Sequence, residues 1–174
     1  LQIDNAEITV ARDGQSHTVQ IPELHVNPHQ TTILLGPSGA GKSVLLKTLS
    51  GVFPANLVNV SGKIELCGRQ FHNSVSPEEP KTWADRGSVF YIFQDPRTYL
   101  HSRLKVSQYP ALIAHATDSD KDITQKFISL IGEAGLGGRL DTPSGKLSGG
   151  EAQRLMLVMM QLLQPSVVLG DEPL

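Results

Sequence analysis

The sequence predicts an α/β fold, in which a core of strands and helices carries an inserted α-helical subdomain. Strand patterns separated by turns, around one helix, occupy residues 1–94. The pattern becomes helical in residues 95–150, where apolar residues recur at helical spacing. Residues 151–174 supply a last helix and an apolar strand, which return the chain to the core. A length of 174 residues fits one such domain with a substantial core.

The composition is that of an ordinary folded chain and gives no sign of a nucleic-acid partner. Hydrophobic residues make up 39% and charged residues 18%, which is unlike a disordered chain. The formal net charge is −2, whereas nucleic-acid-binding domains are usually basic. The longest apolar stretch, residues 155–163, is too short to cross a bilayer. A role at a membrane is therefore expected to depend on a partner protein.

Strands are expected in the first segment where apolar residues alternate or form short runs. Residues 8–10 and the alternating residues 19–21 lie on either side of a turn at residues 12–15. Residues 62–66 and 88–93 are further strand candidates.

A strand, a loop and a helix are expected in succession between residues 32 and 51. Residues 32–35 form an apolar run that ends in glycine, which is typical of a buried parallel strand. Residues 43–49 are expected to form a helix, which Gly51 and then Pro54 terminate.

The connection between this strand and this helix matches the phosphate-binding pattern GxxxxGK(S/T). Glycines let several backbone N–H groups turn toward a phosphate, and the helix adds the positive end of its dipole. Lys42 would give a full charge to the β- and γ-phosphates, and the Ser43 hydroxyl would bind Mg²⁺. An ordinary glycine turn explains less of the pattern. Nucleotide binding is therefore predicted for Gly36, Pro37, Ser38, Gly39, Ala40, Gly41, Lys42 and Ser43.

Helices dominate the second half of the chain. A helix is expected over residues 120–136, because Ile123, Phe127, Leu130, Ile131 and Ala134 fall on one face. Gly135 stands where this helix should end. A last helix is expected from about residue 149 to residue 163, and Pro165 separates it from an apolar strand at residues 167–169.

Residues 147–154 read LSGGEAQR and resemble the signature motif of ATP-binding cassette (ABC) ATPases over its whole length. A serine-capped helix start would explain Ser148 but not the rest of the string. Chemically, a serine hydroxyl and bare backbone N–H groups at a helix N-terminus make a second anion site. The resemblance implies that Ser148, Gly149 and Gly150 face the γ-phosphate of ATP bound by a second ABC ATPase domain. Two ATP molecules would then lie in a head-to-tail homodimer or heterodimer.

The resemblance extends to two further motifs, which stand in the order of the family. Residues 167–172 look like a Walker B strand that ends in two carboxylates, and Gln94 looks like the Q-loop glutamine. Paired acids at a strand end are by themselves as consistent with a solvated turn. The family implies that Asp171 helps to hold Mg²⁺, that Glu172 polarises the attacking water, and that Gln94 reaches both.

These motifs together imply an ATPase with ATP and Mg²⁺ as its cofactors. Glu172, Gln94 and Lys42 are the expected catalytic residues, and Ser43, Gln94 and Asp171 are the expected Mg²⁺ ligands. The family fold is a P-loop NTPase (RecA-like) core with an N-terminal antiparallel β region and an inserted α-helical subdomain. Hydrolysis is expected only in the complete, dimeric domain.

The sequence around the Q-loop resembles one group of ABC importers. Residues 93–106, FQDPRTYLHSRLKV, are similar to the FQDPxTxLxPxxxV of oligopeptide, dipeptide and nickel importers, and Met159 fits the same group. This resemblance implies an ATPase subunit that energises uptake of a small solute such as a peptide or nickel. Its partners would be a transmembrane permease and a solute-binding protein, at the cytoplasmic face of the membrane. No nucleic-acid partner is expected.

Two other functions remain as alternatives: a soluble ABC ATPase that acts on nucleic acid or the ribosome, and a nucleotide-binding subunit that does not hydrolyse ATP. The residue that stacks on adenine is also open between Arg12 and His17. Because the family continues beyond its Walker B strand with a D-loop and a switch histidine, we expect the natural protein to be longer. Residues 1–174 alone are not expected to turn over ATP.

Overall fold

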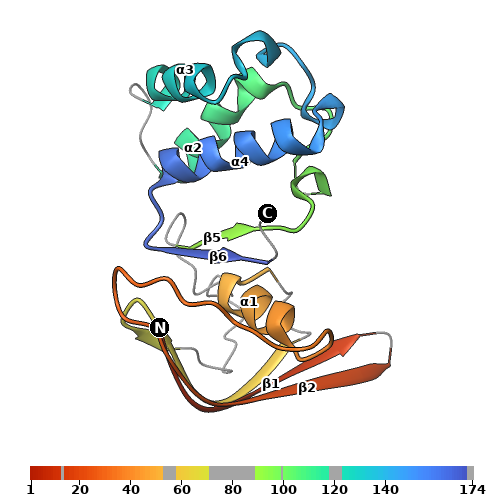
Figure 1. Cartoon of the computed structure of the whole chain (residues 1–174), viewed down its shortest axis with the longest axis vertical. Coiled ribbons are helices and arrows are strands. Elements are labelled where there is room, and N and C mark those ends of the chain that lie inside the picture. Colours follow the sequence, from red (N-terminus) through yellow and green to blue (C-terminus); the bar gives the residue numbers. More distant parts are fainter. Residues whose placement is uncertain (13, 53–57, 71–88, 99, 118–122, 172–174) are drawn as a thin grey trace. The chain divides into compact units, whose positions relative to one another are not determined.

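A computed structural model describes residues 1–12, 14–52, 58–70, 89–98, 100–117 and 123–171 (Figure 1). The chain divides into two compact units, residues 1–85 and 86–174, and each is described by itself. Among the described residues, the first unit contains an antiparallel sheet and one helix, whereas the second contains a parallel strand pair and three α-helices. This mixed content and the N-terminal antiparallel sheet confirm the predicted α/β class.

The sheet of the first unit is built on a long hairpin. β1 (Gln2–Arg12) pairs antiparallel with β2 (Gln15–His25) and, on its other side, with β3 (Val58–Leu66). β4 (Arg69–Gln70) completes the order β2-β1-β3-β4. The turn predicted between the first two strands is therefore confirmed, although both strands extend well beyond the predicted residues.

One face of this sheet carries the core of the first unit. Ile3, Ile8, Val60 and Ile64 are all at most 5% exposed. Ile3 pairs with Ile64 and Ile8 pairs with Val60, and the register shift between Asp4 and Glu7 keeps both pairs on the same side of the sheet.

The helix of the first unit is α1 (Lys42–Ser50), close to the predicted range. Gly51 ends it in the left-handed region, at φ 70°, and its N–H donates to the carbonyl oxygens of Lys47 and Thr48. The glycine stop that the sequence predicted is thus confirmed.

The strand predicted at residues 32–35 is wrong. The described residues 31–37 contain no strand, and the side chains of Ile33 and Leu35 are 76% and 89% exposed. A strand forms only where a neighbouring strand pairs with its backbone. Within the first unit the described strands form an antiparallel sheet that does not include this segment, so its apolar pattern is not matched by burial.

The second unit places a parallel strand pair beside a cluster of helices (Figure 1). β5 (Val89–Ile92) pairs with β6 (Val167–Gly170) in the register Val89 to Val167 and Ile92 to Gly170. Both strands agree with the sequence within about one residue. The helices are α2 (Tyr109–Thr117), α3 (Ile123–Glu133) and α4 (Gly149–Leu163).

The three helices share one hydrophobic core. Its largest buried members are Phe127, Ile131, Leu136 and Leu155, all at most 1% exposed. Phe90 and Phe93 pack against this cluster, so β5 supports the helices from below in the view of Figure 1. α3 begins at Ile123, and the part of its predicted range before that residue lies outside the described residues. Across the described part of the chain, no helix is long and apolar enough to cross a membrane.

Short 3₁₀ turns join the helices to each other and to β5. η2 (Pro96–Thr98) follows β5, and η3 (Val106–Gln108) leads into α2. η4 (Gly137–Arg139) and η5 (Ser144–Lys146) fill the connection between α3 and α4.

Candidate functional site

The predicted phosphate loop is an exposed connection that ends in α1. Residues 36–40 are all exposed, and the loop tightens where Ala40 N–H donates to Pro37 O (3.2 Å). The Lys42 ammonium donates to Gly36 O (2.8 Å) and Pro37 O (2.9 Å). These bonds hold the cation over the loop. Phosphate oxygens are stronger partners than neutral carbonyls, so a bound phosphate can replace them.

The backbone of this loop requires glycine at two positions. Gly39 and Gly41 have φ values of 82° and 89°, a region that side chains disfavour. A Cβ atom on Gly41 would also overlap the side chain of Val19 in β2. Gly41 is the N-cap of α1 and makes no side-chain cap hydrogen bond. The first turn of α1, which includes Ser43, therefore has no side-chain cap at the place where a phosphate is predicted to bind.

The Q-loop and Walker B residues follow the carboxyl ends of paired strands. Gln94 lies two residues after β5, and Asp171 comes directly after β6. The N–H of Asp171 donates to Ile92 O (3.0 Å), which extends the ladder by one step. The structure thus brings Gln94 and Asp171 to the same edge of the parallel pair, where ligands of α/β folds usually bind. Glu172 lies outside the described residues.

Tyr91, which belongs to none of the predicted motifs, contacts the carboxylate of Asp171. Its hydroxyl donates to Asp171 Oδ2 over 2.9 Å, and its ring packs against Phe93 at a centroid distance of 4.4 Å. A tyrosine in an apolar strand gives no sequence signal for such a contact, because the partner is 80 residues away.

The signature motif forms the capped start of α4. Ser148 Oγ accepts from the N–H of Glu151 (3.2 Å), and the Glu151 carboxylate accepts from the N–H of Ser148 (2.8 Å). This reciprocal pair is a capping box. Because the Ser148 oxygen accepts from the backbone, its hydroxyl hydrogen can still be donated to an anion.

Arg139 supports this helix start from a different segment. Its Nε donates to the Glu151 carboxylate over 2.7 Å. The backbone N–H of Ser148, and then the Arg139 guanidinium, lower the pKa of the Glu151 carboxyl to about 2. Glu151 therefore stays ionised at neutral pH, and Arg139 offsets its negative charge beside the predicted anion site. No motif in the sequence singles out Arg139.

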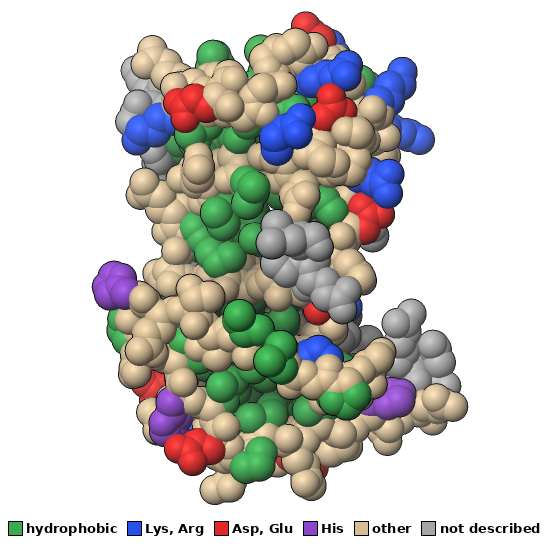
Figure 2. Space-filling view, viewed as in Figure 1, with side chains coloured by type: hydrophobic (Ala, Val, Ile, Leu, Met, Phe, Trp, Pro, Cys, Tyr) green, Lys and Arg blue, Asp and Glu red, His purple; other side chains and the backbone are tan. Residues whose placement is uncertain are grey.

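The segment after the Q-loop is hydrogen-bonded to the segment before the signature. The backbone bonds are Val106 N to Thr142 O (3.1 Å), Ser107 N to Leu140 O (2.9 Å), Ser144 N to Leu104 O (2.8 Å) and Gly145 N to Ser102 O (3.1 Å). Lys105 adds an exposed ion pair with Asp141 (3.1 Å). In Figure 2, both basic and acidic side chains are present on the surface of this helical part of the second unit.

A buried hydroxyl pair completes this connection. Tyr109 OH donates to Ser144 Oγ (3.0 Å), which donates to His101 O (2.8 Å). Ser144 is fully buried, so its hydroxyl relies on these partners. The positions of Ser148 and of the residues after Gln94 therefore depend on each other.

The predicted Mg²⁺ ligands agree with the chemistry of that ion. A serine hydroxyl, an amide oxygen and a carboxylate are hard oxygen donors, as Mg²⁺ prefers. Within the described ranges, no cluster of three or more His, Cys, Asp or Glu residues could hold a metal ion. A few protein oxygens together with substrate phosphates and water are the usual Mg²⁺ arrangement in nucleotide enzymes, so these residues fit it. The two candidates for adenine stacking, Arg12 and His17, lie at the ends of β1 and β2 that meet at the hairpin turn.

Comparison with known proteins places these motifs in one family. Residues 19–174 match the family model described as "ABC transporter". The chain is 33% identical over 162 residues to a putative hemin import ATP-binding protein of Staphylococcus haemolyticus, covering 92% of this chain and 69% of that protein. It is 31% identical over 168 residues to a phosphate import ATP-binding protein of Mycolicibacterium smegmatis, covering 92% and 62%.

A third relative broadens the range of named solutes. The chain is 32% identical over 143 residues to a nickel import ATP-binding protein of Rhodobacter capsulatus, covering 82% of this chain and 54% of that protein. The chain thus spans between 54% and 69% of the length of these three relatives. Their names differ in solute and do not favour the peptide and nickel group over the others. The chain belongs to the ABC transporter family, as an ATP-binding domain with the P-loop NTPase fold.

Proposed function

We propose that this chain is the ATP-binding and ATP-hydrolysing part of an ABC importer subunit. The observation that carries the proposal is that both glycine motifs form helix starts, at α1 and at α4, where an anion can bind. A chain that binds one nucleotide needs only the first. The second is explained if it completes the site of a partner ATPase domain, identical or paralogous, in a head-to-tail dimer.

The residues divide the work between binding and hydrolysis. The backbone of the phosphate loop and Lys42 hold the phosphates, and Ser148 donates its hydroxyl to the γ-phosphate bound by the partner. Glu172 accepts a proton from the attacking water, and Gln94 orients that water. Ser43, Gln94 and Asp171 would hold Mg²⁺, which neutralises charge that develops on the phosphates.

The solute and the membrane partner belong to the same proposal. The Q-loop resemblance favours a peptide, nickel or a related small solute, delivered by a solute-binding protein to a permease. The ATPase would sit at the cytoplasmic face of the membrane, bound to that permease. Purification of the natural protein in mild detergent, followed by mass spectrometry, should recover a multi-span permease. Recovery of ribosomes or nucleic acid in its place would favour the soluble alternative.

Two substitutions test the assigned chemistry in the complete natural protein. Lys42→Ala should weaken ATP binding, measured with a fluorescent ATP analogue, by roughly 10-fold or more, because a charge-assisted contact to phosphate is lost. Glu172→Gln should bind ATP normally but hydrolyse it roughly 100-fold or more slowly, because the general base is removed.

A matched control for the first substitution is Lys47→Ala, in the last turn of the same helix. It should change neither binding nor hydrolysis. Hydrolysis at the wild-type rate by Glu172→Gln would show that the assignment of the base is wrong. Normal ATP binding by a protein that never hydrolyses it would favour the non-hydrolysing alternative.

A further inference from the structure

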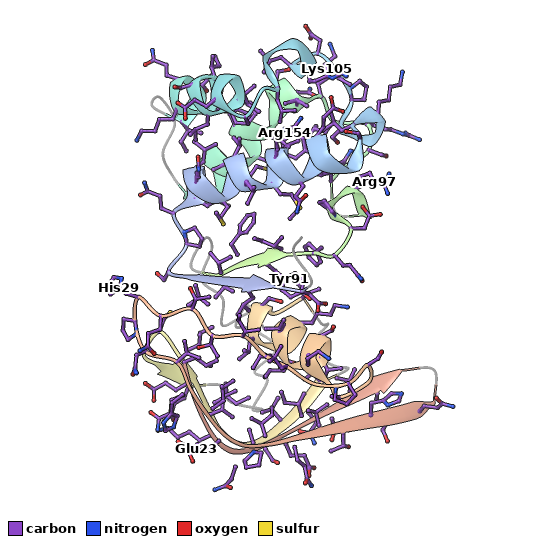
Figure 3. The ribbon with its side chains drawn as sticks, in the orientation of Figure 1. Glu23, His29, Tyr91, Arg97, Lys105 and Arg154 are labelled. Atoms are coloured by element: carbon purple, nitrogen blue, oxygen red, sulfur yellow. The ribbon has the colours of Figure 1, made fainter. Side chains whose placement is uncertain are left out.

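Tyr91 is a buried polar side chain that none of the recognised motifs includes. It lies in β5, is 7% exposed, and carries a hydroxyl that needs a hydrogen-bond partner when it is buried. That partner is the Asp171 carboxylate, whose Oδ2 accepts from the hydroxyl over 2.9 Å. Figure 3 labels Tyr91 at the parallel strand pair. The contact joins β5 to the residue that follows β6.

The strand register places these two side chains together. Tyr91 is opposite Leu169, and Leu169 and Asp171 point to the same face because side chains alternate along an extended chain. Asp171 is therefore the diagonal neighbour of Tyr91, within reach of a long aromatic side chain. The backbone bond from Asp171 N to Ile92 O fixes the carboxylate end, and the packing of Tyr91 on Phe93 fixes the ring.

The chemistry of this contact suits a carboxylate that serves a cation. A phenol is a neutral donor, so it restricts the rotation of the carboxylate without cancelling its negative charge. An ammonium or guanidinium in the same place would compete with a metal ion for that charge. Carboxylates that hold metal ions are commonly oriented by such outer hydrogen bonds.

We propose that Tyr91 is a positioning residue for Mg²⁺, whose hydroxyl orients the Asp171 carboxylate toward the metal that accompanies the nucleotide. This inference rests on the proposed function, because it assumes that the chain binds nucleotide with Mg²⁺. Tyr91 itself touches neither nucleotide nor metal.

The direct test is Tyr91→Phe in the complete natural protein, which removes one oxygen atom and keeps the ring. Binding of a fluorescent ATP analogue is measured as Mg²⁺ is titrated and again with excess EDTA. The variant should need roughly 10-fold more Mg²⁺ for half-maximal metal-dependent binding, which is the scale of losing an outer hydrogen bond. Its affinity for the nucleotide in EDTA should equal that of the wild type.

Ser129→Ala is the control, because it removes another side-chain hydroxyl of the same unit, one that donates to Glu133 within α3. It should leave the Mg²⁺ dependence unchanged. A double-mutant comparison adds Tyr91→Phe to Asp171→Asn, and the hydroxyl should then have no further effect on the Mg²⁺ requirement. Equal Mg²⁺ requirements for Tyr91→Phe and wild type would overturn the inference. Failure of the wild type to bind nucleotide at all would instead overturn the proposed function.

A second measurement covers the case in which Tyr91→Phe does not fold. In the complete natural protein, ¹³C-labelled tyrosine introduced at position 91 alone gives a single Cζ resonance, so no other tyrosine has to be assigned. Adding Mg²⁺ to the nucleotide-bound wild type should shift the Tyr91 resonance, because the metal draws charge from the shared carboxylate. A Tyr91 resonance whose chemical shift does not change when Mg²⁺ is added would overturn the inference.

Discussion

The two helix starts that are predicted to bind anions in this chain are built in opposite ways. α1 begins after Gly41, which has a φ of 89° and makes no side-chain cap hydrogen bond. α4 begins after Ser148, whose side chain and backbone both bond to Glu151, and Arg139 holds Glu151 in turn. The first start depends on glycine backbone alone, whereas the second depends on side chains from two segments.

This difference matches different tasks. A helix start without a side-chain cap directs its N–H groups toward an incoming anion, which suits the principal phosphate site. A helix start that already has a side-chain cap has fewer unpaired backbone N–H groups with which to bind an anion by itself. It can add a serine hydroxyl to a phosphate that another domain holds. The comparison predicts that α1 is sensitive to glycine replacement and α4 to the loss of its tertiary hydrogen bonds.

The largest effect is expected from Gly41→Ala. A side chain at a positive φ costs about 1–2 kcal/mol, and overlap with Val19 adds about 1–3 kcal/mol. We expect a loss of about 3 kcal/mol in the free energy of unfolding, measured by urea denaturation. ATP binding should be weakened as well, because the loop changes shape.

Gly39→Ala is the matched control for this experiment. Gly39 also has a positive φ, 82°, but no described atom lies within 4 Å of an added Cβ. Its cost should be confined to the backbone, about 1–2 kcal/mol. When Val19→Ala is combined with Gly41→Ala, it should recover part of the lost free energy of unfolding. Combined with Gly39→Ala, it should recover none. Equal losses in the two glycine variants would contradict the role of Val19.

The next effect concerns the buried hydroxyls that support the α4 start. Ser144→Ala leaves Tyr109 OH and His101 O without their partner, so it should lower the free energy of unfolding by about 1–3 kcal/mol. Tyr109→Phe should cost less, about 1 kcal/mol, because Ser144 still donates to His101. Urea denaturation compares the two variants. A larger loss of unfolding free energy in Tyr109→Phe than in Ser144→Ala would contradict the arrangement in which Tyr109 donates to Ser144 and Ser144 donates to His101.

The sequence predicted local features well and tertiary ones poorly. The hairpin turn, the helix at α1 and its stop at Gly51 follow from neighbouring residues, and the structure confirms them. A serine-capped helix start was one interpretation of Ser148 in the sequence. The structure has this cap, directly before the two glycines of the motif. In each case the deciding interaction spans only a few residues.

The errors and omissions depend on distant residues. Residues 32–35 have the composition of a buried strand, yet strand pairing is set by neighbours that a local pattern does not name. α2 was not predicted: Pro110, in its first turn, resembles a helix breaker unless the helix begins at that point. The partners of Asp171 and Glu151 come from 80 and 12 residues away, with no spacing rule to reveal them.

The smallest effect, on the pKa of Glu151, tests the claim that α4 depends on side chains. This pKa is about 2 in the folded chain and 4.5 as a reference, so ionised Glu151 stabilises the fold above about pH 4.5. That contribution is lost as the pH falls from 4.5 toward 2. Arg139→Gln should raise the pKa but leave it below 4.5, because the larger cause, the Ser148 N–H, remains. A ¹³C titration of the Glu151 carboxyl measures this shift.

Lys105→Gln is the control for this titration, because it removes a different exposed ion pair of the same connection. It should leave the pKa of Glu151 unchanged. Urea denaturation gives a second measurement of this pH dependence. Between pH 6 and about pH 3, the free energy of unfolding should fall further in the wild type than in Glu151→Gln. The α1 start has no acidic residue in its first turn, so it should contribute nothing to this pH dependence. If Arg139→Gln left the pKa at about 2, the Ser148 backbone alone would hold Glu151, and the two helix starts would be more alike than their contacts indicate.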